Sequence, residues 1–153
     1  MKIAITGHTS GLGKFLFDEY SLYHDCIGFS RSNGYDLEKD HNIIVKQIES
    51  CDLFINNSFA MGAQMKYLQS CRDIKHVVMG SIAARSPNPD MPYYCAEKKK
   101  IEEYFLKNYN HTKNDFLYLQ LTGKSYRQFP LIFDAIEFWL KNNSVNFIGF
   151  QTE

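Results

Sequence analysis

The chain has 153 residues, with 17 basic and 17 acidic side chains and therefore no net charge. This length predicts a single domain, residues 1–153, and the 44% of hydrophobic residues is enough for a packed core. The balanced charge argues against a protein that grips nucleic acid or an anionic membrane surface through a basic face, so we expect neither partner.

Short apolar runs alternate along the chain with segments of helical periodicity. The runs are continuous, which is typical of strands buried on both faces, and they span 2–6, 25–29, 52–56, 76–81, 116–121 and 145–150. Apolar residues at three- and four-residue spacing predict helices over 12–23, 43–48, 61–71, 91–109 and 129–142. The alternation predicts an α/β fold: a Rossmann-type, doubly wound parallel sheet of about six strands with helices on both faces.

The four cysteines, Cys26, Cys51, Cys71 and Cys95, are too far apart for a C-x-x-C redox or zinc motif. We therefore expect free thiols in a cytoplasmic protein. No apolar run approaches the ~20 residues of a membrane span, and the first run is too short for the core of a signal peptide. The five histidines lack metal-ligand spacing, so no metal is expected, and His8 is interpreted as a solvated loop residue.

A glycine-rich segment follows the first predicted strand and opens the first predicted helix. Gly7 suits a tight turn, Gly11 allows a pyrophosphate to approach the backbone, and Gly13 lets the helix pack against the strand. The amino end of a helix also offers free N–H groups to a phosphate. The spacing alone fits an ordinary glycine-rich turn equally well. Its position favours a dinucleotide-binding loop made by Gly7, Thr9, Ser10, Gly11, Leu12 and Gly13.

The order Gly-x-x-x-Gly-x-Gly, with Thr6 before it, resembles the short-chain dehydrogenase/reductase family, of which the chain looks like a shortened member. Further motifs follow in the family's order along essentially the whole chain; they are Asp36 with Leu37, then Asn56, Asn57 and Ser58, and then Ser81, Tyr94 and Lys98. The resemblance implies that the last three residues are catalytic. It also implies that Lys98 holds the nicotinamide ribose while hydride passes between the cofactor and a small carbonyl or alcohol substrate.

The two short motifs between the glycine loop and Ser81 are assigned by the same resemblance. Asp36 and Leu37 are similar to the acidic and apolar pair that meets the adenine. Asn56, Asn57 and Ser58 look like the family's Asn-Asn-Ala-Gly segment, with Ser58 where Ala is usual and Gly missing. These five residues are therefore expected in the cofactor site.

The pairing of Tyr94 with Lys98 has a physical rationale of its own. Residues four apart share one helix face, and a nearby cation stabilises a phenolate and lowers the tyrosine pKa towards a value useful for proton transfer. Tyr93 is the competing candidate, but its partner four residues on is Glu97, which would raise its pKa. Lys98 shares its stripe with Ile101 and Phe105, whereas the other charged residues of this helix are expected mainly elsewhere; they are Lys99, Lys100, Glu102 and Glu103.

Ser81 closes a predicted strand and is expected to point into the crevice at the carboxyl ends of the strands. A hydroxyl there can hold and polarise a substrate carbonyl while Tyr94 donates its proton. The alternative is a simple cap at the end of the strand.

The choice of cofactor is expected to depend on the segment after the second strand. Enzymes that prefer NAD place an acidic residue there, but this chain has Ser30, Arg31 and Ser32. Arg31 can pair with a 2′-phosphate, and the serines or Thr9 could add hydroxyl donors. The sequence therefore predicts NADP(H) over NAD(H), the alternative being that Arg31 is a solvated loop residue.

The chain also departs from the family. Only about twenty residues separate Arg31 from Asp52, so an edge strand is expected to be lost or reduced to a few residues near Tyr35. The third helix is short, with no equivalent of the family's catalytic Asn, and residues 122–128 replace a long substrate-covering loop. These departures favour an alternative function, a non-catalytic dinucleotide-binding module that senses redox state or supports an assembly.

The last predicted helix, 129–142, is apolar over most of its circumference. A surface helix of a small domain cannot be buried on every side, so this pattern indicates a contact with a partner. Because family members commonly dimerise in this way, we expect a homo-oligomer through helices 91–109 and 129–142. The alternative is that the C-terminal tail covers the helix.

Overall fold

The computed structural model describes residues 1–60, 62–109, 115–122, 126–142 and 145–150. These residues contain six strands that belong to one sheet. The chain divides into two compact units, Met1–Val77 and Val78–Glu153, and each is described by itself. The expectation that residues 1–153 form a single domain stays a prediction.

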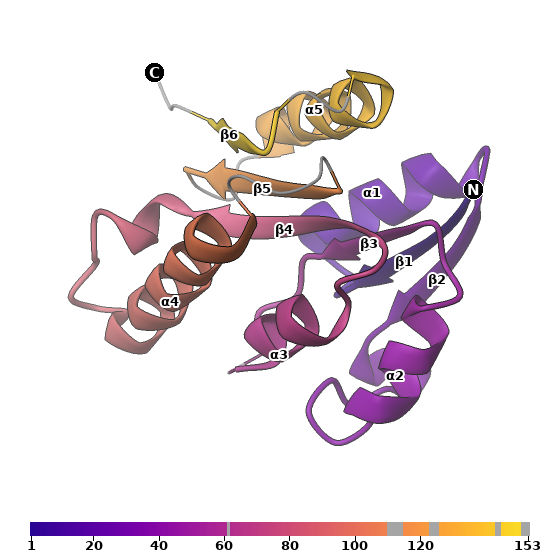
Figure 1. Cartoon of the computed structure of the whole chain (residues 1–153), viewed down its shortest axis with the longest axis horizontal. Helices are drawn as coiled ribbons and strands as arrows, with labels where there is room; N and C mark the ends of the chain where they lie inside the picture. The colour runs from indigo at the N-terminus through magenta and orange to yellow at the C-terminus, as the bar shows by residue number, and fades with distance from the viewer. Residues whose placement is uncertain (61, 110–114, 123–125, 143–144, 151–153) are drawn as a thin grey trace. The chain divides into compact units, whose positions relative to one another are not determined.

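The first unit is built on three parallel strands. Their order is β2 (Asp25–Phe29), β1 (Lys2–Thr6) and β3 (Leu53–Asn56), and Ile3 of β1 stands opposite Cys26 on one side and Leu53 on the other. Figure 1 shows α1 (Gly11–Ser21) on one side of these strands, and α2 (His41–Ile48) with α3 (Ala63–Ser70) on the other. A short 3-10 helix, η1 (Arg31–Asn33), follows β2.

The second unit continues the same strand–helix alternation. Strand β4 (Lys75–Ser81) enters it, followed by the 3-10 helix η2 (Ile82–Ala84), α4 (Pro92–Tyr109), β5 (Phe116–Leu121), η3 (Tyr126–Gln128), α5 (Phe129–Asn142) and β6 (Phe147–Gly149). The strand order is β4-β5-β6, with Leu119 of β5 opposite Ile148 in a parallel pair. In Figure 1, α4 and α5 lie on opposite sides of β5. The predicted α/β fold of Rossmann type, with helices on both faces, is thus confirmed.

The burial of the strands explains their continuous apolar sequences. All of β3 is buried, as are all but one residue each of β1 and β5. Strands β2 and β6 are the exceptions, because each pairs with only one neighbour among the described strands; three of the five residues of β2 and all of β6 are half-buried or exposed. The prediction that these two runs are buried on both faces is therefore wrong, and β6 is shorter than the expected 145–150.

Most of the other predicted boundaries agree with the structure to within about two residues. Helix α1 ends at Ser21, two residues before the predicted boundary, so Tyr23 lies beyond the helix and is 82% exposed rather than part of the helical stripe. The edge strand expected to be lost is absent, since only η1 and α2 lie between β2 and β3, and all residues of that stretch are described. Position 61, where the third helix was expected to begin, lies outside the described residues.

All four cysteines are free, as expected from their spacing. Within the described residues, no helix is both long and apolar enough to cross a membrane. No group of His, Cys, Asp and Glu side chains in that part of the chain could hold a metal ion.

His76, at the start of β4, is the most deeply buried ionisable group of the first unit. Its side chain is fully buried, its ring centroid lies 4.6 Å from that of Phe54, and its Nδ1 lies 3.3 Å from the carbonyl oxygen of Cys71. Burial lowers the pKa of His76 from about 6.5 to about 3, against a small opposing effect of the hydrogen bond. The imidazole is therefore neutral in the folded protein over the ordinary pH range.

This burial predicts a pH dependence of stability. Below pH ~6.5 the unfolded chain takes up a proton at His76 that the folded chain accepts only near pH 3. The free energy of unfolding should thus fall by about 1.4 kcal/mol per pH unit from this group as the pH decreases through that window. Chemical denaturation at several pH values should show that the free energy of unfolding falls less steeply with decreasing pH for His76→Gln than for the wild type. The half-buried His24→Gln serves as the control, and equal slopes for His76→Gln and wild type would contradict the prediction.

Candidate functional site

The glycine-rich loop joins β1 to α1 through two backbone positions that favour glycine. Gly7 has φ +69° and Gly11 has φ +53°. The N–H of Gly7 donates to the carbonyl oxygen of Phe29, 2.9 Å away, which ties the loop to the end of β2. Ser10, the N-cap residue of α1, makes no side-chain capping bond, and the first turn has no acidic residue. This helix end therefore retains the positive character that suits an anion.

Gly13 and Gly11 differ in the space around them, and the difference matches their predicted roles. A Cβ atom built on Gly13 would collide with the carbonyl oxygen of Gly7 and with the side-chain amide of Asn57. A Cβ built on Gly11 would meet nothing within 4 Å. Gly13 is thus required for close packing of α1, whereas the backbone at Gly11 stays open to a ligand. Of the remaining loop residues, Thr9 and Ser10 are exposed and Leu12 is half-buried.

The segment after β3 packs directly onto this loop through Thr6. The hydroxyl Oγ1 of Thr6 accepts hydrogen bonds from the N–H groups of Asn57 and Ser58, both at 3.1 Å. The Asn57 amide also donates to the carbonyl oxygens of Thr6 and Gly7, at 3.3 and 3.5 Å. The structure thus brings Asn57 and Ser58 to the glycine loop. Thr6, which was not among the predicted site residues, holds them there.

Asn56 directly precedes Asn57 and Ser58, but its side chain bonds to α3 rather than to the glycine loop. Its amide donates to the carbonyl oxygen of Gln64 at 2.9 Å, and the Gln64 amide donates to the carbonyl oxygen of Asn56 at 2.8 Å. Both residues are buried, and this reciprocal pair joins β3 to α3. Gln64 had no signal in the sequence, because its partner is defined only by the packing of α3.

The residues expected to select the cofactor form a compact turn after β2. Ser30 Oγ lies 2.8 Å from Ser32 Oγ, and the N–H of Ser30 donates to Asn33 Oδ1 at 2.9 Å. The Asn33 amide donates in turn to the carbonyl oxygen of Gly28 at 2.7 Å. Arg31 lies on this turn and is exposed. Asn33 therefore shapes the turn that carries Arg31, a role the sequence did not indicate.

Asp36 and Leu37 occupy the loop before α2. The carboxylate of Asp36 accepts hydrogen bonds from the N–H groups of Lys39 and Glu38, at 3.1 and 3.0 Å, and these bonds lower the pKa of Asp36. The side chain of Leu37 is buried in the core between the sheet, α2 and α3, and its carbonyl oxygen accepts a bond of 2.9 Å from the Tyr67 hydroxyl. Both residues are thus held in place by contacts of their own loop and of α3.

His8 differs from the expected solvated loop residue. Its ring is half-buried, with its centroid 4.9 Å from that of Phe17. It fills the space beside Gly28, where a Cβ would collide with the imidazole. Desolvation lowers the pKa of His8, so the ring packs as a neutral group. The interpretation as a solvated residue is wrong because β2 lacks a side chain at Gly28 and leaves room for the ring.

The second unit holds the three residues predicted to be catalytic. Ser81 ends β4 and is 8% exposed, and its hydroxyl Oγ accepts a hydrogen bond of 3.2 Å from the N–H of Ala83. The structure therefore contains the cap that the sequence offered as the alternative for Ser81. Capping uses one lone pair of the hydroxyl and leaves its O–H able to donate.

Tyr94 and Lys98 lie on the same face of α4, as their spacing predicts. Lys98 is only 3% exposed, and its ammonium group donates to the carbonyl oxygen of Met79 at 2.7 Å. The same ammonium lies 5.6 Å from the centroid of the half-buried Tyr94 ring, within the range of a cation–π contact. Because Met79 is two residues before Ser81, Lys98 links the helix that carries Tyr94 to the strand that carries Ser81.

Glu102 was expected mainly on the charged, outer part of α4, and this expectation is wrong. It is 7% exposed and its carboxylate accepts hydrogen bonds from Arg85 at 2.7 Å and from Tyr118 and Gln120 at 3.2 Å each. Burial, with the charge of Glu102, raises the pKa of Tyr118 above its usual range. The polar partners on β5 compensate the burial of this carboxylate, and they cannot be recognised from the periodicity of α4 alone.

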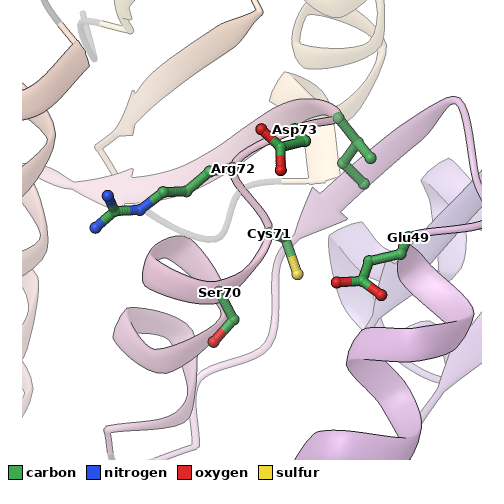
Figure 2. Close-up of a pocket in the computed structure, with 6 residues that line it drawn as sticks. Glu49, Ser70, Cys71, Arg72 and Asp73 are labelled. Carbon is green, nitrogen blue, oxygen red and sulfur yellow. The ribbon is translucent and has the colours of Figure 1, made fainter.

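A pocket in the first unit is lined by none of the predicted site residues. It is lined by Glu49, Ser70, Cys71, Arg72, Asp73 and Ile74, between the end of α2 and the start of β4 (Figure 2). Figure 2 shows the Cys71 sulfur and the Glu49 carboxylate turned towards the same space. Burial, aided by the charge of Glu49, raises the pKa of Cys71 to about 12. The thiol is therefore protonated at neutral pH and unsuited to nucleophilic chemistry.

Comparison with known proteins shows similarity in structure only. No protein-family model and no curated protein matches the sequence. Among solved structures, a small-chain dehydrogenase matches with a TM-score of 0.73 and 17% identity over 99% of this chain and 96% of that one. Serine dehydrogenase from Escherichia coli matches with a TM-score of 0.70 and 13% identity, over 99% and 97% of the two chains.

A third match is the 3-alpha-hydroxysteroid dehydrogenase from Pseudomonas sp. B-0831 complexed with NADH, with a TM-score of 0.64 and 16% identity over 97% of this chain and 95% of that one. At such identities the likeness concerns the fold. It extends over nearly the whole of both chains in these three matches. This chain has the Rossmann-type α/β fold of the short-chain dehydrogenase/reductase family.

Proposed function

We propose that this protein is a cytoplasmic, NADP(H)-dependent dehydrogenase/reductase that interconverts a small carbonyl compound and its alcohol. The observation that carries the proposal is the burial of Lys98 beside Tyr94. A buried ammonium is costly unless polar groups compensate it, and the carbonyl oxygen of Met79 is one such partner. A helix that keeps a cation in this position beside a phenol is suited to stabilise the phenolate form of that phenol.

The proposed roles follow from the groups at the carboxyl end of β4 and on α4. Tyr94 donates the proton to the substrate oxygen during reduction and takes it back during oxidation, and Lys98 stabilises the phenolate that results. Ser81, whose O–H remains able to donate, holds and polarises the substrate carbonyl. The bound nicotinamide dinucleotide supplies or accepts the hydride.

The first unit contains residues that fit such a dinucleotide. The backbone at Gly11 is open, Gly13 keeps α1 close to β1, and the first turn of α1 lacks acidic residues, so a pyrophosphate has both space and N–H donors. We assign the cofactor site to this loop, to Asn57 and Ser58 beside it, to the turn with Ser30 and Arg31, and to the loop with Asp36 and Leu37. Asn56, whose amide bonds to Gln64 of α3, is assigned the role of holding Asn57 and Ser58 in place.

Arg31 provides a test of cofactor preference. Its guanidinium group should pair with the 2′-phosphate of NADPH, so Arg31→Gln should weaken NADPH binding at least ~10-fold and leave NADH binding within about twofold. Fluorescence titration of the wild type and the variant with both dinucleotides measures this. Arg72→Gln, another exposed arginine, is the matched control. A lower dissociation constant for NADH than for NADPH in the wild type would refute the preference.

Tyr94 provides a test of catalysis. Tyr94→Phe removes the proton donor and keeps the ring beside Lys98, so turnover of a carbonyl substrate should fall on the order of 10²–10⁴-fold while NADPH binding persists. Steady-state kinetics and the same titration measure the two effects separately. Tyr93→Phe is the control, since the neighbouring ring is 78% exposed.

The second candidate function is a dinucleotide-binding module without catalysis. One observation favours it: Ser81 already has a structural role as the cap of η2. A binding module would titrate with NADPH but show no turnover that Tyr94→Phe could remove. A wild type that binds dinucleotide and reduces none of a broad panel of aldehydes and ketones would establish this alternative.

We further propose that the protein forms a homo-oligomer through α4 and α5. On α5, Leu131 is 57% exposed and Phe138 is 52% exposed, and their seven-residue spacing places them on one helix face. Tyr93 in the first turn of α4 is also exposed, as is Met91, which directly precedes the helix. The apolar stripe formed by Leu131 and Phe138 on α5 is what a partner helix would cover.

The oligomer should be sensitive to charge on this stripe. Light scattering at micromolar concentration should show a dimer or larger species for the wild type and a monomer for Leu131→Asp combined with Phe138→Asp. The exposed Lys141→Asp, on the same helix, should leave the mass unchanged. A monomeric wild type would remove the proposal.

A further inference from the structure

A buried polar network connects α4, β4 and β5 in the second unit, and the proposed chemistry does not use it. Glu102 stands four residues after Lys98 and eight after Tyr94, on the same stripe of α4. One of its carboxylate oxygens accepts from Arg85 Nε at 2.7 Å. The other accepts from the Tyr118 hydroxyl and the Gln120 amide, each at 3.2 Å.

Tyr118 carries this network to the strand that ends in Ser81. The side chain of Tyr118 is fully buried, and its ring tip lies where a Cβ of Gly80 would be, so residue 80 must be glycine for the ring to pass. An atom at the Cβ position of Gly80 would also collide with the Tyr118 hydroxyl oxygen, so this oxygen abuts the backbone immediately before Ser81. The phenol oxygen of Tyr118 therefore lies between the Glu102 carboxylate and the backbone that leads into Ser81.

The network is more than a way to fill the core. An apolar pair of similar volume at positions 102 and 118 would pack without the desolvation cost of a carboxylate, so stability alone does not explain these polar residues. Arg85, whose guanidinium lies over the Phe147 ring at 5.1 Å, is held from two sides and keeps the charge of Glu102 compensated. The polar pair adds a defined orientation of the Tyr118 side chain. A hydrogen-bonded hydroxyl has one favourable position, whereas an apolar contact has many.

We propose that Glu102 and Tyr118 are positioning residues for Ser81. Glu102 orients the hydroxyl of Tyr118, this hydroxyl fixes the backbone at Ser81 next to the flexible Gly80, and Ser81 Oγ is thereby held in register with Tyr94 and Lys98 on the same helix as Glu102. The inference rests on the proposed function for the role of Ser81, but the geometry that it describes does not.

Two conservative variants test the proposal. Tyr118→Phe keeps the ring beside Gly80 and removes only the hydroxyl, and Glu102→Gln keeps the shape of the side chain and removes its charge. Glu103→Gln, the exposed neighbour on α4, is the matched control for the second variant. If Tyr118→Phe does not yield folded protein, the same measurements on Glu102→Gln, compared with Glu103→Gln, test the proposal.

The kinetic readout separates positioning from stability. We expect Tyr118→Phe to raise KM for the carbonyl substrate and to lower kcat/KM ~10-fold or more, because a small displacement of a substrate-holding group is costly. Glu102→Gln should give a smaller change in the same direction, and the dissociation constant of NADPH should stay within about twofold. A purely structural role would lower the folded fraction, which reduces apparent kcat and leaves KM unchanged, and that result would overturn the proposal.

Amide hydrogen exchange at Ser81, followed by NMR, tests the geometry independently of activity. In Tyr118→Phe the amide of Ser81 should exchange ~10-fold faster or more, while core amides of β5 stay protected. Should the wild type reduce no substrate while Ser81 exchange still accelerates, the proposed function fails and the positioning of the Ser81 backbone stands. Unchanged exchange in both variants would overturn the positioning, whatever the activity.

Discussion

The burial of the Lys98 ammonium is the constraint on which the arrangement of the second unit depends. A charged group in the protein interior must be met by polar partners, and here the carbonyl oxygen of Met79 on β4 is one of them. This bond joins the Lys98 face of α4 to β4. Once Lys98 faces β4, the helical period brings Tyr94 and Glu102 to the same side, and the outer face is left to residues such as Lys99 and Glu103.

In the first unit the buried polar group is the Thr6 hydroxyl, and backbone N–H groups are its partners. Thr6, at the end of β1, gathers the N–H groups of Asn57 and Ser58, and the glycine at position 13 allows α1 to approach the Gly7 carbonyl. Polar groups therefore collect at the carboxyl ends of β1 and β3, where sheets of this type place their ligands. The pocket with Cys71 lies between the end of α2 and the start of β4, and its protonated thiol offers no comparable chemistry.

The second unit also shows how one side chain can make structural contacts and keep polar groups available. Ser81 caps η2 through its oxygen while its O–H remains able to donate, and Tyr118 fills the space at Gly80 while its hydroxyl donates to Glu102. Such double roles make the alternatives considered for Ser81 compatible rather than exclusive. Conservative substitutions around β4 are therefore informative, because they remove a hydrogen bond and the orientation it gives without removing much side-chain volume.

The strand and helix pattern, the glycine loop and the Tyr94–Lys98 pair could be read from the chain because each is local. Their signals are runs, spacings of three or four residues, and a motif at a strand–helix junction. The inward position of Lys98 was also predictable, from its apolar stripe.

Glu102, Thr6, Gln64 and His8 acquired their positions only in the folded molecule. Glu102 looks like one of several charges on α4 until Tyr118, 16 residues away, is placed beside it. Thr6 meets Asn57 across 51 residues, and His8 packs where Gly28 leaves room on the neighbouring strand. Local periodicity specifies which face of an element is apolar, but the partner of a buried polar group is chosen by strand order and register, which bring together residues that are distant along the chain.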